Sequence, residues 1–102
     1  MNRLVLAAHV VERGAMRYTP AGLPALDLTL QSDSEVTQNG QPRKVSLQIR
    51  AVAIGDITRP AQALVLGSPA QFAGFLAPSR NGKGVVFHVT SIATEEPDLQ
   101  PG

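Results

Sequence analysis

ALDLTLQ (residues 25–31) and RKVSLQIR (residues 43–50) each alternate apolar and polar side chains. Because successive side chains of a β-strand point to opposite faces, this alternation predicts two strands that each have an apolar and a polar face. In the first strand, Leu26, Leu28 and Leu30 would point into a core. In the second strand, the core face would hold Val45, Leu47 and Ile49, and the solvent face Lys44, Ser46, Gln48 and Arg50.

The segment between these strands, SDSEVTQNGQP at residues 32–42, is polar. It contains Asn39-Gly40, a pair that tolerates positive φ and is typical of turns. The sequence therefore predicts a hairpin with a long, mobile tip, whose second strand continues through Val52 to Ile54.

Three other stretches predict strands. NRLVLAAHVV at residues 2–11 is rich in Leu and β-branched residues, although a short helix is a rival interpretation. Turn signals follow it at Gly14 and in TPAGLP at 19–24. VVFHVTSIA at 85–93 reads as the last strand.

The strand PAQFAGFLA at 69–77 is interrupted by Gly74, where a bulge or sharp bend costs least. The residues around it, 55–68 and 78–84, are predicted loops, the first with a short helical turn. Five strands in a chain of 102 residues favour a five-stranded Greek-key barrel over a sandwich, which usually needs about seven strands. We expect one all-β domain over residues 1–94 and a short acidic tail over 95–102.

Composition excludes several classes of protein. The chain has no cysteine, hence no disulfide or thiolate metal site, and its apolar runs are too short to cross a bilayer. With no signal-like start, the expected location is the cytoplasm. The net charge is only +1, but without the acids of the tail (Glu95, Glu96 and Asp98) nine cations face five acids, so a modest basic face is expected.

The stretches NRLVLAAHVV, RYTPAGLPALDLTL at 17–30 and GFL at 74–76, in this order, resemble the single-stranded DNA-binding protein family. Within that family they are most similar to the branch of primosomal replication protein N, the PriB branch. The resemblance extends over residues 2–93. It implies a homodimer of oligonucleotide-binding (OB) folds that binds single-stranded DNA in replication restart, together with the PriA helicase and other primosome proteins.

Two departures from the branch concern DNA binding. Members can carry an aromatic residue for base stacking where this chain has Ser46, and the basic loop of some relatives is reduced here to Arg80 and Lys83. Base stacking on an aromatic contributes ~1–3 kcal/mol per base, so its loss should weaken binding.

The exposed face of a Greek-key barrel around its second and third strands, framed by the first and last hairpin loops, is where such barrels bind oligomers. The phosphate-binding candidates on this face are cationic, with Tyr18 as a possible stacking ring in the first loop. The rival interpretations are a charged strand edge that opposes aggregation and a tyrosine that packs its own loop. The predicted nucleic-acid-binding residues are Arg17, Tyr18, Arg43, Lys44, Ser46, Gln48, Arg50, Arg80 and Lys83, with Arg3 and Arg13 as weaker candidates.

The first strand is apolar on both faces, and a barrel wall needs only one such face. Pairing of this strand between two copies would cover the second face and remove an exposed edge. The alternative is burial within the chain itself. The predicted dimer interface consists of Leu4, Val5, Leu6, Ala7 and Val11.

The sequence favours a binding protein over an enzyme. His9 and His88 are its only histidines, and they have no cysteine partners or matched nucleophile, so we predict no catalytic site, no metal and no cofactor. The phenylalanines are expected in the core. A rival function is an adaptor that uses the barrel to bind the helicase and binds DNA weakly or not at all.

Overall fold

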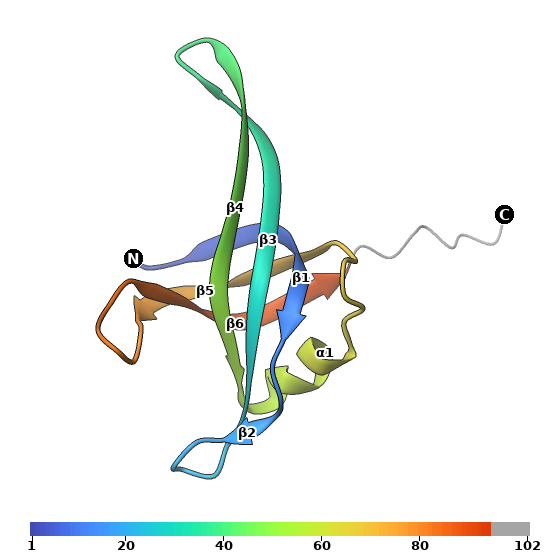
Figure 1. The fold of residues 1–102 in the computed structure, drawn as a ribbon, viewed down its shortest axis with the longest axis vertical. Helices are drawn as coiled ribbons and strands as arrows, with labels where there is room; N and C mark the ends of the chain where they lie inside the picture. The colour runs from blue at the N-terminus through green and yellow to red at the C-terminus, as the bar shows by residue number, and fades with distance from the viewer. Residues whose placement is uncertain (95–102) are drawn as a thin grey trace, which may run out of the picture.

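The computed structural model describes residues 1–94, whose strands form one sheet that closes into a barrel (Figure 1). The strand order is β1-β5-β6-β4-β3-β2, and β1 also pairs with β3, which closes the sheet. The predicted all-β barrel of five long strands is confirmed, and the predicted tail, 95–102, lies outside the described residues. The elements are β1 (Leu4–Arg13), β2 (Arg17–Tyr18), β3 (Pro24–Gln38), β4 (Gln41–Ile54), the 3-10 helix η1 (Gly55–Ile57), α1 (Thr58–Ala63), β5 (Ala70–Pro78) and β6 (Val85–Thr94).

The core contains the side chains that the alternation in β3 predicts. Leu26, Leu28 and Leu30 are buried, and they pack with Phe72 of β5 and Phe87 of β6, which are fully buried. Burying a side chain of this size stabilises a fold by about 1.5–3 kcal/mol. The first stretch of the chain is a strand rather than the alternative helix, and its inward positions complete this core.

The predicted long tip of the β3–β4 hairpin is wrong. The strands pair continuously out to Gln38 and Gln41, and only Asn39 and Gly40 form the turn, both at positive φ. An Asn-Gly turn with two positive φ values matches the twist of paired strands, so it closes a hairpin without a longer loop. The outer half of the hairpin, residues 33–46, is a two-stranded ribbon that projects beyond the barrel (Figure 1).

This ribbon also changes the predicted core face of RKVSLQIR. Ile49 packs against the core, but Val45 is only half-buried and Leu47 is exposed. The reason is that β4 leaves the barrel at this point. The apolar and polar side chains still alternate, but no core covers the apolar ones.

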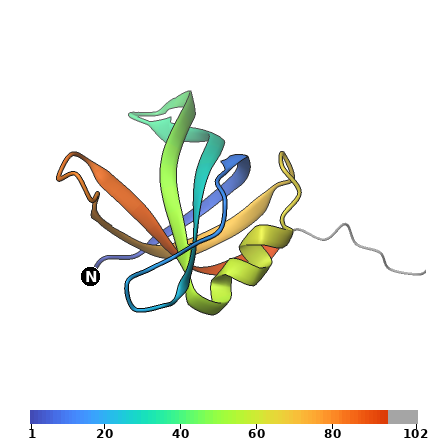
Figure 2. The ribbon, with the colours of Figure 1, turned by 60° about the horizontal axis from the view of Figure 1, so that its bottom comes forward.

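The connection from β4 to β5 contains the short helical turn that the sequence predicts. Helix α1 buries Ala61 at one end of the barrel (Figure 2), and the Arg13 guanidinium donates a 2.6 Å hydrogen bond to the backbone oxygen of Leu64. Arg13 therefore fixes the end of this helix.

No helix among residues 1–94 is long and apolar enough to span a membrane.

Gly74 marks an irregularity in the sheet, as predicted. The pairing of β5 with β6 shifts between Ala73 and Gly74, where Thr90 of β6 is the additional residue. A Cβ on Gly74 would lie 1.8 Å from the backbone oxygen of His88, so only glycine allows the two strands to approach this closely.

Candidate nucleic-acid interface

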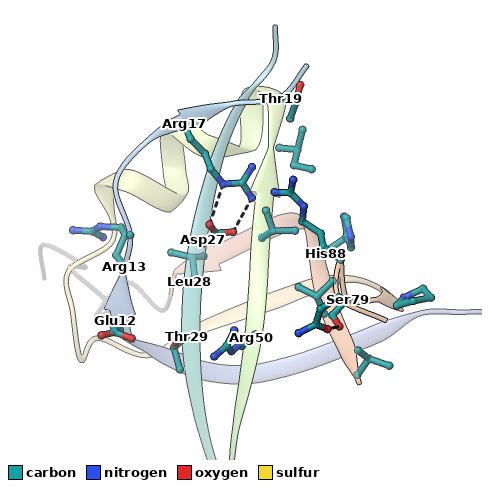
Figure 3. Close-up of a pocket in the computed structure, with 18 of the residues that line it drawn as sticks. Glu12, Arg13, Arg17, Thr19, Asp27, Leu28, Thr29, Arg50, Ser79 and His88 are labelled. Atoms are coloured by element: carbon teal, nitrogen blue, oxygen red, sulfur yellow. Dashed lines mark hydrogen bonds and ion pairs between the residues drawn. The ribbon is translucent and has the colours of Figure 1, made fainter. Parts of the chain in front are cut away.

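A groove lies on the outer face of the barrel between the first loop and the β5–β6 turn (Figure 3). It encloses about 1030 Å³, and the outward side chains of β3, β4 and β6 form its floor. This is the face on which the Greek-key barrel was expected to bind a ligand. Its charged lining residues are Arg13, Arg17, Arg50, Arg80, Lys83, Glu12 and Asp27.

Arg17 and Asp27 form an ion pair in this groove. Arg17 lies in β2, a short strand within the predicted first loop, and β2 pairs with the start of β3. Its Nε donates to Asp27 Oδ2 and its Nη2 to Asp27 Oδ1, both at 3.0 Å. Arg17 is therefore in the groove, as predicted, but a carboxylate already occupies its guanidinium.

Asp27 is surrounded by positive charge. The hydrogen bond from Arg17 holds the pKa of the Asp27 carboxyl below its usual value, and the positive charges of Arg17, Arg80 and Arg50 act in the same direction. Three positive charges therefore act on the Asp27 carboxylate: Arg17 in the first loop, Arg50 on β4 and Arg80 on the β5–β6 turn. This arrangement identifies the positive side of the groove.

Arg80 and Lys83 lie on a turn with a well-defined internal hydrogen-bond network. Asn81 Oδ1 accepts a 2.6 Å hydrogen bond from Ser79 Oγ and a 2.9 Å hydrogen bond from the backbone N–H of Lys83. The Gly82 N–H donates to the Ser79 carbonyl at 2.9 Å. The predicted loop over 78–84 is therefore an ordered turn, and it presents two exposed cations at one side of the groove.

The predicted residues of the β4 polar face lie in two places, because β4 runs from the barrel out into the ribbon. Arg50 lines the groove, whereas Lys44 and Ser46 lie on the ribbon beyond it. Lys44 faces Glu35 across the ladder, and Ser46 Oγ donates a 2.5 Å hydrogen bond to Asp33. The outer part of the predicted patch therefore has acidic partners of its own.

Three further predicted residues also lie outside the groove lining. Arg43 lies on the opposite face of β4, since it is one residue from Lys44, and its Nη1 donates to Gln38 Oε1 at 2.8 Å. Gln48 pairs with Gln31 on the outer face. Tyr18 is 68% exposed and is not among the residues that line the groove.

The prediction that the phenylalanines lie in the core is wrong for Phe75. Its side chain is 39% exposed, and it stacks on His88, which lines the groove. The sequence contained a usable signal, because Phe72 and Phe75 are three residues apart and must point to opposite faces of one strand. The pairing of Phe75 with His88 required the register of β5 against β6.

The predicted dimer residues belong to two faces of β1. Leu4 and Leu6 are half-buried and pack against the core of their own chain. Val5, Ala7 and Val11 point outward, and Val5 is 49% exposed. These three outward side chains leave an apolar face of β1 in solvent.

Among residues 1–94 no group of three potential metal ligands lies together.

Comparison with known proteins gives the family. Residues 2–91 match the family model described as another single-strand binding protein family. Replication restart protein PriB of Bordetella pertussis is 55% identical over 80 residues, which cover 78% of this chain and 75% of that protein. A solved structure of PriB from Ralstonia solanacearum has a TM-score of 0.85 and 33% identity, covering 94% of this chain and 99% of the other.

A deletion mutant of the single-stranded DNA-binding protein from Thermus aquaticus is also similar, with a TM-score of 0.73 and 28% identity over 94% of this chain and 51% of that one. The sequence match to PriB covers most of both chains, and the match in fold covers nearly all of both. The chain therefore belongs to the PriB family of replication restart proteins, within the single-strand binding proteins.

Proposed function

We propose that this chain binds single-stranded DNA without sequence specificity in the replication restart primosome, and that the groove holds the phosphodiester backbone. The observation that supports this most is the convergence of Arg17, Arg50, Arg80 and Lys83, from three separate parts of the chain, on one groove of an OB fold. The names of the relatives support the same assignment.

The geometry favours the backbone as the bound group. Arginine and lysine side chains neutralise phosphates and release condensed counterions, and this term does not depend on sequence. Arg80 and Lys83 are exposed on the β5–β6 turn, and Arg50 is exposed on β4, so a bound strand would contact one wall and the floor of the groove. Arg17 donates to Asp27 from Nε and Nη2, so Nη1 is the nitrogen that it would offer to a phosphate.

The proposal extends to two partners. We infer that the chain forms a homodimer through the outward face of β1 and assists the PriA helicase at the fork. The apolar side chains of Val5, Ala7 and Val11 support the first, because an exposed apolar face of this kind is stabilised by a second copy. Membership of the PriB family supports the second.

The function is tested by titrating labelled oligothymidine with the protein at several salt concentrations, with a duplex of equal length as the control. We expect tighter binding to the single strand, and log K should fall against log salt by about 0.7 per phosphate contacted. Absence of binding at low salt, together with retained binding to the helicase, would instead support the adaptor function.

A further inference from the structure

Phe75 and His88 form a stacked pair of rings on the outer surface of the barrel. Their centroids are 4.9 Å apart and their planes differ by 9°. Phe75 is 39% exposed, whereas Phe72 and Phe87 are fully buried, so one phenylalanine is kept at the surface of a small protein that has few aromatic residues. Flat aromatic surfaces favour other flat rings, which stack on them with an offset.

The pair lies beside the groove on one continuous row of strand partners. Asp27 of β3 pairs with Val52 of β4, Val52 with His88 of β6, and His88 with Phe75 of β5. These four side chains therefore cross the outer face in that order. Figure 3 shows Asp27 and His88 on opposite sides of β4, within the same groove.

The row places an apolar, aromatic surface next to the cations. Val52 is buried between Asp27 and His88, so the floor of the groove becomes apolar on the β6 side. The cations suit phosphates, and a planar, uncharged group joined to a phosphate chain suits the rings. A nucleotide has both parts.

We propose that Phe75 and His88 form a base-stacking platform for single-stranded DNA, which takes the place of the aromatic residue missing from residues 43–50. This inference rests on the proposed function and assigns it the residues that contact bases. Because every base has an aromatic face, stacking here requires no particular sequence. The cations would hold the backbone while the ring pair holds one base of the bound strand.

The competing aromatic residue is Tyr18, which is more exposed than Phe75. Neither Tyr18 nor Phe75 is among the groove-lining residues, but His88, on which Phe75 stacks, is one of them. A second copy of the chain could also cover Phe75, since β5 pairs with β1. The test below separates these possibilities.

The test compares Phe75→Leu with the natural chain and with Leu66→Ala, a change at an exposed apolar side chain that does not line the groove. Each protein is titrated with oligothymidine and with an abasic oligonucleotide of the same length, over a range of salt concentrations. We expect Phe75→Leu to bind oligothymidine about 5- to 150-fold more weakly than the natural chain, the range for loss of stacking on one base. The salt dependence should not change, because no cation is lost, and abasic binding should be the same for both proteins.

A second measurement uses the natural chain alone. Irradiation with an oligonucleotide that contains 5-iodouracil, followed by mass spectrometry, should give cross-links at Phe75 or His88. In the titration, the platform is refuted if Phe75→Leu binds oligothymidine as tightly as the natural chain does. In the cross-linking experiment, it is refuted if only Tyr18 is cross-linked. It is also refuted if Phe75→Leu changes the oligomeric mass but not the binding of DNA. If the natural chain binds no single strand at low salt, the proposed function itself fails and the platform with it.

Discussion

Arg17 and Asp27 form a two-point ion pair in a groove that three other arginines also line. If the groove holds phosphate, as proposed, an acid in its lining opposes the ligand directly and also pairs with one of the cations. The side chains of Arg17 and Asp27 are 37% and 57% exposed, so the pair contributes little to stability, about 0–1 kcal/mol. Its larger effect should be on binding.

Asp27→Asn should therefore bind single-stranded DNA more tightly. Removal of one unit charge near a phosphate in a water-exposed site changes the free energy by about 1 kcal/mol, or roughly fivefold in Kd. Asp56→Asn is the matched control, because Asp56 is an exposed acid on η1 that does not line the groove. Equal affinity of Asp27→Asn and the natural chain would show that Asp27 does not restrict binding.

The stability that the pair contributes should depend on pH. Because Arg17 lowers the pKa of Asp27 in the folded chain, the unfolded chain binds more protons in the window between the two pKa values, and stability rises with pH there. The contribution is complete above the ordinary carboxyl pKa of 3.8 and is lost as pH falls through the lower folded value. Urea unfolding of the natural chain and Asp27→Asn should differ at pH 6 and converge at the most acidic pH that the fold tolerates. A difference that grew on acidification would contradict the pair.

Gly74→Ala should destabilise the barrel strongly. Its Cβ would meet the His88 carbonyl oxygen at 1.8 Å, and a backbone atom cannot turn away as a side chain can. Overpacking of this kind costs about 1–3 kcal/mol or more. At Gly14, where φ is not positive and a Cβ would make ordinary contacts at 3.6 Å and beyond, alanine should be neutral or stabilise by about 0.4–1 kcal/mol. Similar unfolding midpoints for the two variants would show that β5 and β6 can separate freely.

The homodimer makes a prediction about mass. Light scattering at micromolar concentration should give twice the 10.8 kDa of one chain. Val5→Glu should reduce the mass to that of one chain, because it places a charge in the apolar face of β1, while Leu66→Glu should leave it unchanged. A mass of 10.8 kDa for the natural chain would exclude the dimer.

Much of this fold could be predicted from local pattern, and the reasons are physical. Alternation in residues 25–31 gives the strand and its inward leucines because a period of two follows from backbone geometry alone. The position of the ribbon could not be predicted in the same way. Leu47 alternates just as Ile49 does, and only the path of β4 out of the barrel decides that one is exposed and the other packed.

The candidate site shows the same division. Four cations could be placed at the groove from the sequence: Arg17, Arg50, Arg80 and Lys83. An OB fold brings together its first loop, its third long strand, which is β4 here, and its last loop. The partners of these residues depend on register. The pair of Arg17 with Asp27 follows from the pairing of β2 with β3, and the stack of Phe75 on His88 follows from the pairing of β5 with β6.

The most direct measurement compares the salt dependence of oligothymidine binding for the natural chain, for the double variant Arg50→Ala with Arg80→Ala, and for Lys44→Ala. Arg59→Ala is the matched control, because Arg59 is an exposed cation on α1 outside the groove. If the groove holds the backbone, the double variant should lose affinity and about 1.4 units of the slope of log K against log salt, from about 0.7 per phosphate contact. Lys44→Ala should lose less than half of the slope that the double variant loses, and Arg59→Ala should match the natural chain. An unchanged slope in the double variant, with a reduced slope in Lys44→Ala, would place the DNA on the ribbon and contradict the groove as the binding site.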